Sequence, residues 1–121
     1  PGSLGKGASL YKNVAEVGGV DSNGAFVRES YDAAALIVLA AQAGNSADRA
    51  SIAKNVMNVA NAPGTKIYPG ELKKGLELLA KGKNVNYIGA SDVTFTDVGE
   101  ASGSFLEMVV KGDDFKGIKQ R

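Results

Sequence analysis

An almost wholly apolar stretch in the first half of the chain most constrains its fold. Residues 29–44 read ESYDAAALIVLAAQAG. Apolar side chains recur there at the three-and-four spacing of a helix face and fill most other positions, which predicts a helix buried on several sides. The stretch is roughly 14 residues long, whereas a membrane span needs about 20. Glu29 and Asp32 suit the positive end of a helix dipole. We therefore expect the central core helix of a soluble domain.

Composition excludes several classes of function. The 121 residues leave room for one domain with one modest core. The chain has 14 Lys and Arg against 13 Asp and Glu, a net charge of +1, which gives no electrostatic case for a nucleic-acid or anionic-membrane partner. It has neither His nor Cys, so the commonest general base, thiol nucleophiles, disulfides and thiolate metal sites are excluded. We expect no metal and no cofactor.

The hydrophobic period changes from helical to alternating along the chain. Helical spacing predicts helices at 8–17, from between 25 and 32 to 44, at 46–60 and at 71–81. In the first of these, Leu10, Val14 and Val17 are expected to face inward. Alternation predicts strands at 84–88, 93–96 and 104–111, a glycine-bearing loop at 97–103 and a frayed tail to Arg121. The pattern indicates an α/β chain whose β region is short and C-terminal.

The expected strands are too few for a complete α/β layer. A two-stranded hairpin is marginally stable alone. The predicted strands therefore need partner strands or a helix layer from elsewhere. We expect this chain to be part of a larger protein, with exposed strand edges that favour self-association.

Residues suited to catalysis are scarce. The adjacent carboxylates Asp113 and Asp114 lie in a predicted turn, as do Asp97 and Glu100. Exposed turn acids are solvated, and nothing there raises their pKa by burial. We expect no enzymatic activity and no catalytic residues.

Phe26 is the one candidate ligand-binding residue. It lies between a glycine-containing turn and the polar pair Arg28–Glu29, directly before the central helix. A loop aromatic at such a place can line a cleft. The pattern alone is equally compatible with a Phe26 that caps the core.

A series of short motifs resembles a known family. The series consists of SYDAAAL (30–36), the Ser-Ala-Asp start at 46–48, the Ala-Pro-Gly and Tyr-Pro-Gly breaks, YIGAS (87–91), VTFTD (93–97) with Gly99, and the apolar run at 105–110. In this order and spacing they resemble the C-terminal part of type I periplasmic solute-binding proteins. The most similar members are the leucine/isoleucine/valine-binding and amide-binding components of ABC importers. The resemblance covers the chain from about Leu10 to Phe115.

The resemblance implies a fold and a function. It implies a C-terminal fragment of a two-lobed α/β protein, in which residues 1–96 are first-lobe elements, 97–103 cross between the lobes and 104–121 form a second-lobe strand and tail. It also implies a periplasmic protein that binds a branched-chain amino acid or an amide without catalysis and delivers it to an ABC transporter permease. Phe26 would line the ligand's side chain. The alternative is a ligand-sensing or protein-interaction domain of a regulatory protein with the same fold.

Overall fold

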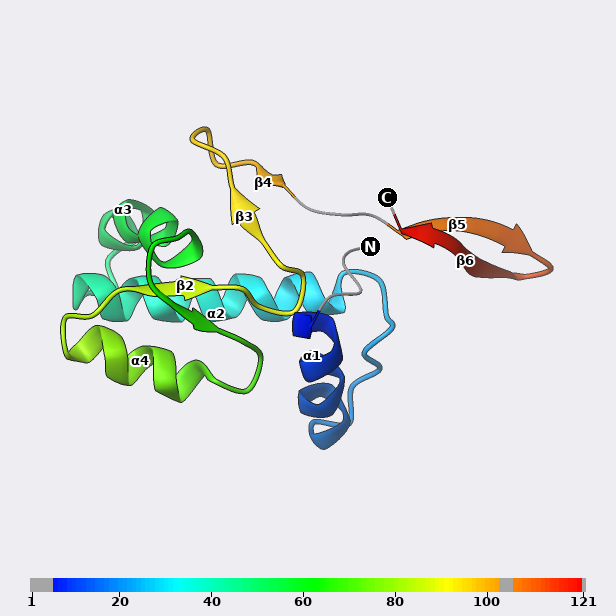
Figure 1. The fold of residues 1–121 in the computed structure, drawn as a ribbon, viewed down its shortest axis with the longest axis horizontal. Helices are drawn as coiled ribbons and strands as arrows, with labels where there is room; N and C mark the ends of the chain where they lie inside the picture. Colours follow the sequence, from blue (N-terminus) through cyan, green and yellow to red (C-terminus); the bar gives the residue numbers. More distant parts are fainter. Residues whose placement is uncertain (1–5, 103–105, 121) are drawn as a thin grey trace.

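The chain is a mixed α/β structure in which helices precede most of the strands (Figure 1). The computed structural model describes residues 6–102 and 106–120. Its helices are α1 (Lys6–Val17), α2 (Val27–Gly44), α3 (Arg49–Ala60) and α4 (Leu72–Ala80). Its strands are β1 (Thr65–Ile67), β2 (Val85–Tyr87), β3 (Thr94–Phe95), β4 (Ala101–Ser102), β5 (Leu106–Lys111) and β6 (Asp114–Gln120). The expected α/β class and all the expected helices are confirmed.

A short parallel β-α-β unit follows the first three helices. Strands β1 and β2 pair in parallel, with Thr65 opposite Val85 and Ile67 opposite Tyr87, and α4 connects them. The sequence analysis missed β1. Only Ile67 of its three residues is buried, so the strand leaves no alternating pattern to detect.

The core lies where α2 packs on α3, α4 and the parallel strand pair. Its buried residues are Ala35, Leu36, Leu39, Ala40, Val59, Ala60, Ile67, Val85 and Tyr87. The expectation that α2 is buried on several sides is wrong for the described residues. Ile37 and Val38, on its opposite face, are 53% and 43% exposed. The neighbouring helices and two strands cover one side of α2 only.

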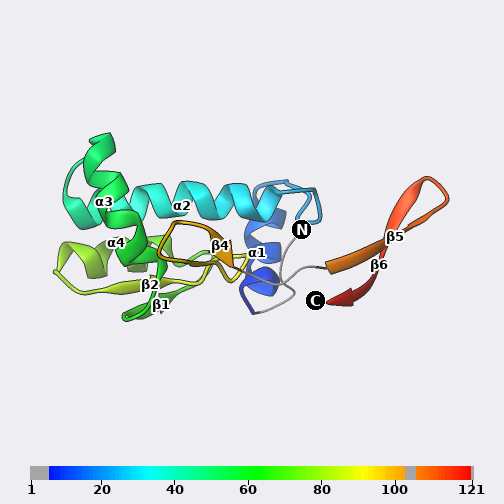
Figure 2. The ribbon, with the colours of Figure 1, turned by 90° about the horizontal axis from the view of Figure 1, so that it is seen from above.

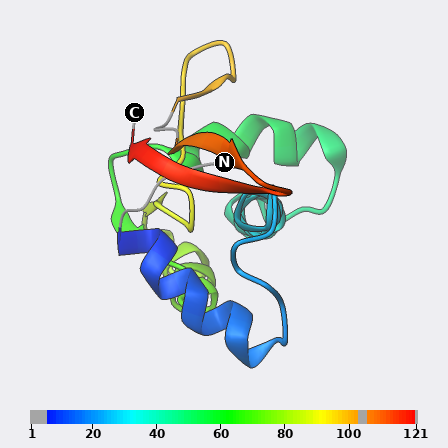
Figure 3. The ribbon, with the colours of Figure 1, turned by 90° about the vertical axis from the view of Figure 1, so that its right-hand side faces the viewer.

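Helix α1 packs at the start of α2 with a different face from the expected one. Its buried residues are Gly7, Tyr11 and Ala15, whereas Val17 is exposed. The small Gly7 lets α1 approach the loop after β2, because a Cβ atom at that position would overlap the Gly89 carbonyl oxygen. The close approach of Gly7 to the Gly89 backbone therefore decides which face of α1 is buried, although larger apolar side chains lie on another face. Figure 3 shows α1 passing beneath α2, which is seen end-on.

Two antiparallel hairpins end the chain. Strands β3 and β4 pair, with Phe95 opposite Ala101, so the expected loop at 97–103 contains a short return strand. Strands β5 and β6 form the second hairpin, which extends away from the helices (Figures 1 and 2). The expectation of a frayed tail is wrong, because residues 114–120 form β6. Residues 104 and 105 of the predicted strand at 104–111 fall outside the described residues.

The turn of the second hairpin explains why the tail is ordered. Lys111 lies opposite Asp114, which leaves a two-residue loop of Gly112 and Asp113. Gly112 adopts a φ of 63°, and two-residue hairpin loops favour glycine in that conformation. This Gly-Asp pair directly follows the predicted strand at 104–111, and in the sequence it is the signal of a hairpin.

Candidate functional site

A buried carboxylate joins α2 to the loop that follows β2. Asp32 is 3% exposed. Its Oδ1 accepts hydrogen bonds of 2.8 Å from the Tyr87 hydroxyl and from the Ala90 backbone N–H. Its Oδ2 accepts one of 2.9 Å from the Ser91 N–H and another from the Ser91 hydroxyl. Asp32 therefore fixes the loop at the carboxyl end of the parallel pair.

Gly89 makes this arrangement possible in two ways. Its φ of 69° lies in the left-handed region that side chains disfavour. A Cβ atom at Gly89 would also lie 2.6 Å from Cε1 of Tyr87 and would collide with the Asp32 carboxylate. The loop can thus reach Asp32 only with glycine at this position.

The electrostatics keep Tyr87 in its neutral, hydrogen-donating form. Burial, followed by the negative charge of Asp32, raises the pKa of Tyr87 well above its ordinary value of 10.0. The same two causes raise the pKa of Tyr11. Each Asp32 oxygen accepts two hydrogen bonds, so the carboxylate is fully engaged within the fold.

Aromatic side chains cover the same end of the sheet. The rings of Tyr11 and Tyr31 lie 5.2 Å apart between centroids at an interplanar angle of 53°. The Tyr31 hydroxyl accepts a 3.2 Å hydrogen bond from the Gly70 N–H, in the loop after β1. The Lys6 Nζ lies 4.5 Å from the centre of the Tyr68 ring, within cation–π range. Helix α1 therefore closes the carboxyl edge, the edge at which open α/β sheets commonly bind ligands.

An open cavity of 730 Å³ lies on the other side of α1, beside the start of α2. It is lined by residues of α1, the loop before α2 and the second hairpin: Ala8, Ser9, Lys12, Asp21, Ser22, Asn23, Ala25, Arg28, Met108, Asp114, Phe115 and Gly117. The lining combines cations, carboxylates, hydroxyls and apolar groups. A few polar groups among apolar ones are common in small-molecule sites.

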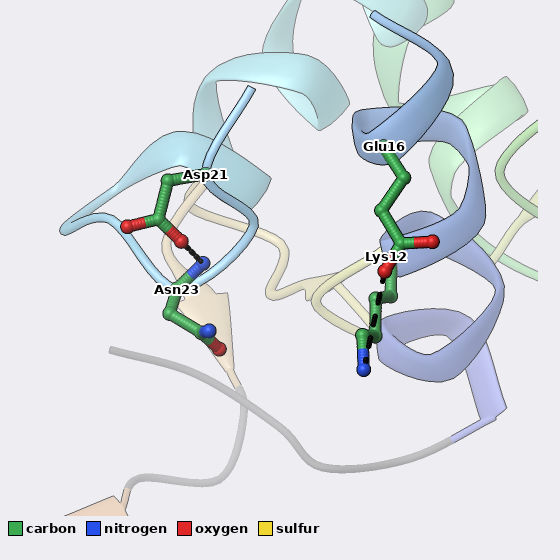
Figure 4. A network of polar contacts seen from close by, with 4 residues as sticks. All are labelled: Lys12, Glu16, Asp21 and Asn23. Atoms are coloured by element: carbon green, nitrogen blue, oxygen red, sulfur yellow. Dashed lines mark hydrogen bonds and ion pairs between the residues drawn. The ribbon is translucent and has the colours of Figure 1, made fainter. Parts of the chain in front are cut away.

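Some polar groups that line the cavity form ion pairs or hydrogen bonds with residues nearby in sequence (Figure 4). Lys12 lies 4.0 Å from Glu16 in an exposed pair one turn along α1. An Oδ1 of Asp21 accepts a 2.9 Å hydrogen bond from the Asn23 N–H, as predicted for the turn before α2. Asp114 likewise accepts from the Phe115 N–H. Each of these groups thus interacts with a residue of its own helix or turn.

Phe26 stands at the N-terminus of α2 and is 66% exposed. Its φ of 59° is left-handed, and its carbonyl accepts hydrogen bonds from the N–H and the hydroxyl of Ser30. Among the described residues, Phe26 does not pack against either core cluster. Its ring does not line the cavity, although Ala25, directly before it, and Arg28, two residues after it, do.

Other candidate features are less informative. A second cavity of 490 Å³ is lined mainly by the end of α3 and the segments around β1 and β2. Asn61 at its edge forms hydrogen bonds with both the N–H and the carbonyl of Phe95, which ties α3 to β3.

Across residues 6–102 and 106–120, no cluster of three or more acidic side chains could hold a metal ion. No helix in the described part combines the length and apolarity needed to cross a membrane.

The sequence predicts only that the Asp32 carboxylate suits the positive end of the helix dipole, whereas the structure shows that its side chain is also buried. The missed signal was spacing, because Asp32 falls on the same helix stripe as Ala35, Leu36 and Leu39. A charged residue on a buried stripe indicates a specific partner elsewhere in the fold.

No protein-family model, curated protein or solved structure matches this chain.

Proposed function

We propose that this chain is the C-terminal part of a periplasmic solute-binding protein of the type I class. Its ligand would be a branched-chain amino acid or a related amide, which the complete protein passes to an ABC transporter permease without chemical change. The sequence motifs at 30–36, 87–91 and 93–97 motivate the proposal. The observation that carries it is the cavity of mixed polarity beside the start of α2, with the exposed Phe26 lying in sequence between two of its lining residues, Ala25 and Arg28.

The exposed apolar surface of α2 supports a larger parent protein. Ile37 and Val38 form an uncovered apolar strip on a helix whose opposite face is core. In a two-lobed parent, the remainder of the first lobe would cover this strip. In the same proposal, residues 97–103 cross from the first lobe to the second.

The described residues supply only half of a binding cleft. The cavity is open, and several of its polar groups bond within their own loops. We therefore expect the 121-residue chain alone to bind solute weakly. Phe26 would contact the ligand's apolar side chain once the second lobe closes over it.

Thermal-shift screening of the complete gene product against amino acids and amides tests this function. The expected result is a product much heavier than 12.4 kDa that one such solute stabilises, with a smaller shift in a Phe26→Ala variant. A complete product of 12.4 kDa that no amino acid or amide stabilises would refute the proposal.

A protein-interaction domain of a regulatory protein is the second candidate. The exposed apolar residues of α2 and of the second hairpin favour it, because such surfaces mark contacts with other proteins. It predicts fusion to a kinase or DNA-binding region instead of a second lobe.

A further inference from the structure

We propose that two copies of this chain associate through the outer edge of β5, forming a continuous four-stranded sheet about a two-fold axis at Val109. This inference concerns the 121-residue chain by itself and does not depend on solute binding. It rests on the pairing, regularity and charge pattern of the second hairpin.

The outer edge of β5 is available for pairing. In the described part of the chain, β5 has β6 as its one strand neighbour. The residues that flank a two-residue loop form a hydrogen-bonded pair, here Lys111 with Asp114. Because successive pairs alternate, the peptide groups of Val110 and Met108 point to the outer edge. A hairpin with such an edge gains stability from further strands.

Strand β6 is less suited to pairing. Its register shifts opposite Glu107 and Met108, so that Ile118 has no partner on β5. Such a bulge bends and twists a strand, and natural proteins use bulges and lysines to protect sheet edges. Gly117 and the exposed Lys116 add to this protection. The paired run from Met108 to Lys111 on β5 has no such irregularity.

The sequence of β5 is complementary to itself in antiparallel register. Centring two copies on Val109 places Met108 of one copy opposite Val110 of the other, and Glu107 opposite Lys111. The peptide groups of Met108 and Val110 both point to the outer edge of β5. They can therefore form a hydrogen-bonded pair across the contact. The second pair brings opposite charges together twice, once at each end of the contact. Both requirements are met by the same register.

The apolar side chains gather on one face of the resulting sheet. Met108 and Val110 lie on the same face of β5, and Phe115 lies opposite Val110 on β6. Val110 is 67% exposed and Phe115 is 65% exposed in the single chain. In the pair, Met108 of each copy would pack against Val110 of the other, which removes apolar surface from water.

Disulfide trapping tests the proposed two-fold axis. The chain has no cysteine, so a Val109→Cys variant carries a single thiol. Facing residues of a non-hydrogen-bonded pair lie about 4.5 Å apart at Cα, within disulfide range. The matched control is Lys116→Cys, opposite Val109 on β6. We expect the Val109→Cys variant to form a linked dimer at least about tenfold faster, because only there do two sulfurs meet. Equal rates, or a faster control, would overturn the proposal.

A charge-reversal mixing experiment provides an independent measurement. Glu107→Lys alone and Lys111→Glu alone each place like charges opposite one another in a homodimer. Mixed at equal concentrations, the two variants restore both opposite-charge pairs. Sedimentation equilibrium should show wild-type dimers, weaker association of each variant alone by about tenfold, and recovery in the mixture. A monomeric wild type up to about 1 mM, or no recovery on mixing, would contradict the proposed register.

Discussion

Asp32 and Tyr87 lie 55 residues apart in sequence and are joined by a 2.8 Å hydrogen bond inside the core. The contact ties the start of α2 to the end of β2 and, through Ala90 and Ser91, fixes the following loop. It holds together the segments at the carboxyl end of the parallel pair.

Replacing Asp32 with Asn should weaken the fold substantially. The amide presents an NH₂ group where the carboxylate oxygens now accept from donors, so at least one buried donor loses its partner. We expect a loss of about 2–3 kcal/mol in the free energy of unfolding, measured by urea denaturation. The control Asp48→Asn changes an exposed carboxylate without a side-chain capping bond and should stay within about 0.5 kcal/mol of wild type. Equal effects of the two substitutions would contradict the assigned role of Asp32.

Stability should fall at alkaline pH because of Tyr87. Its folded-state pKa is raised, so the folded chain keeps the phenolic proton at pH values where the unfolded chain loses it. The stabilisation is therefore complete below the ordinary pKa of 10.0 and decreases as pH rises above it. Tyr87 should contribute a decline of up to about 1.4 kcal/mol per pH unit. Tyr87→Phe should reduce this slope without abolishing it, since the pKa of Tyr11 is also raised. An unchanged slope in the variant would refute this prediction.

Gly89→Ala should be far more damaging than Gly82→Ala. Both glycines have positive φ, of 69° and 74°, so both substitutions carry a similar backbone cost of about 1–2 kcal/mol. A Cβ at Gly82 meets nothing within 4 Å, whereas one at Gly89 collides with Asp32 and Tyr87. We expect an additional loss of about 2 kcal/mol at Gly89 in chemical denaturation. Similar losses at the two sites would show that the loop can move away from Asp32.

The exposed strip of α2 distinguishes a fragment from a complete domain. In the 121-residue chain, Ile37→Lys alters a half-exposed position and should change the unfolding free energy by no more than about 0.5 kcal/mol. In the proposed parent protein the same side chain is buried, and the substitution should cost about 2 kcal/mol or more. A parent protein that tolerates Ile37→Lys as well as the short chain would count against coverage of α2 by the first lobe.

For this chain, the sequence predicts helices better than it predicts contacts between residues that are distant in sequence. Helical spacing and glycine breaks identify all of α1 to α4, because each signal lies within the element itself. Strand β1 and the bond between Asp32 and Tyr87 depend on partners distant in sequence, which periodicity does not reveal. The inner face of α1 is decided by the fit of Gly7 against Gly89, another distant contact.

Phe26 shows how far prediction of the candidate site extends. Its place before the central helix indicates a loop aromatic, and in the described residues its side chain is exposed. The nearby cavity could not be predicted, because its walls come from α1, the loop before α2 and the second hairpin. The fold alone brings these segments together.

Calorimetric titration of leucine, isoleucine and valine tests the central claim most directly, with the complete gene product and the 121-residue chain measured side by side. We predict saturable binding of at least one of these amino acids, or of a related amide, to the complete product. We predict no affinity tighter than about 1 mM for the short chain, because a half-cleft offers too few convergent polar groups. Tighter binding by the short chain, or no binding by the complete product, would contradict the account.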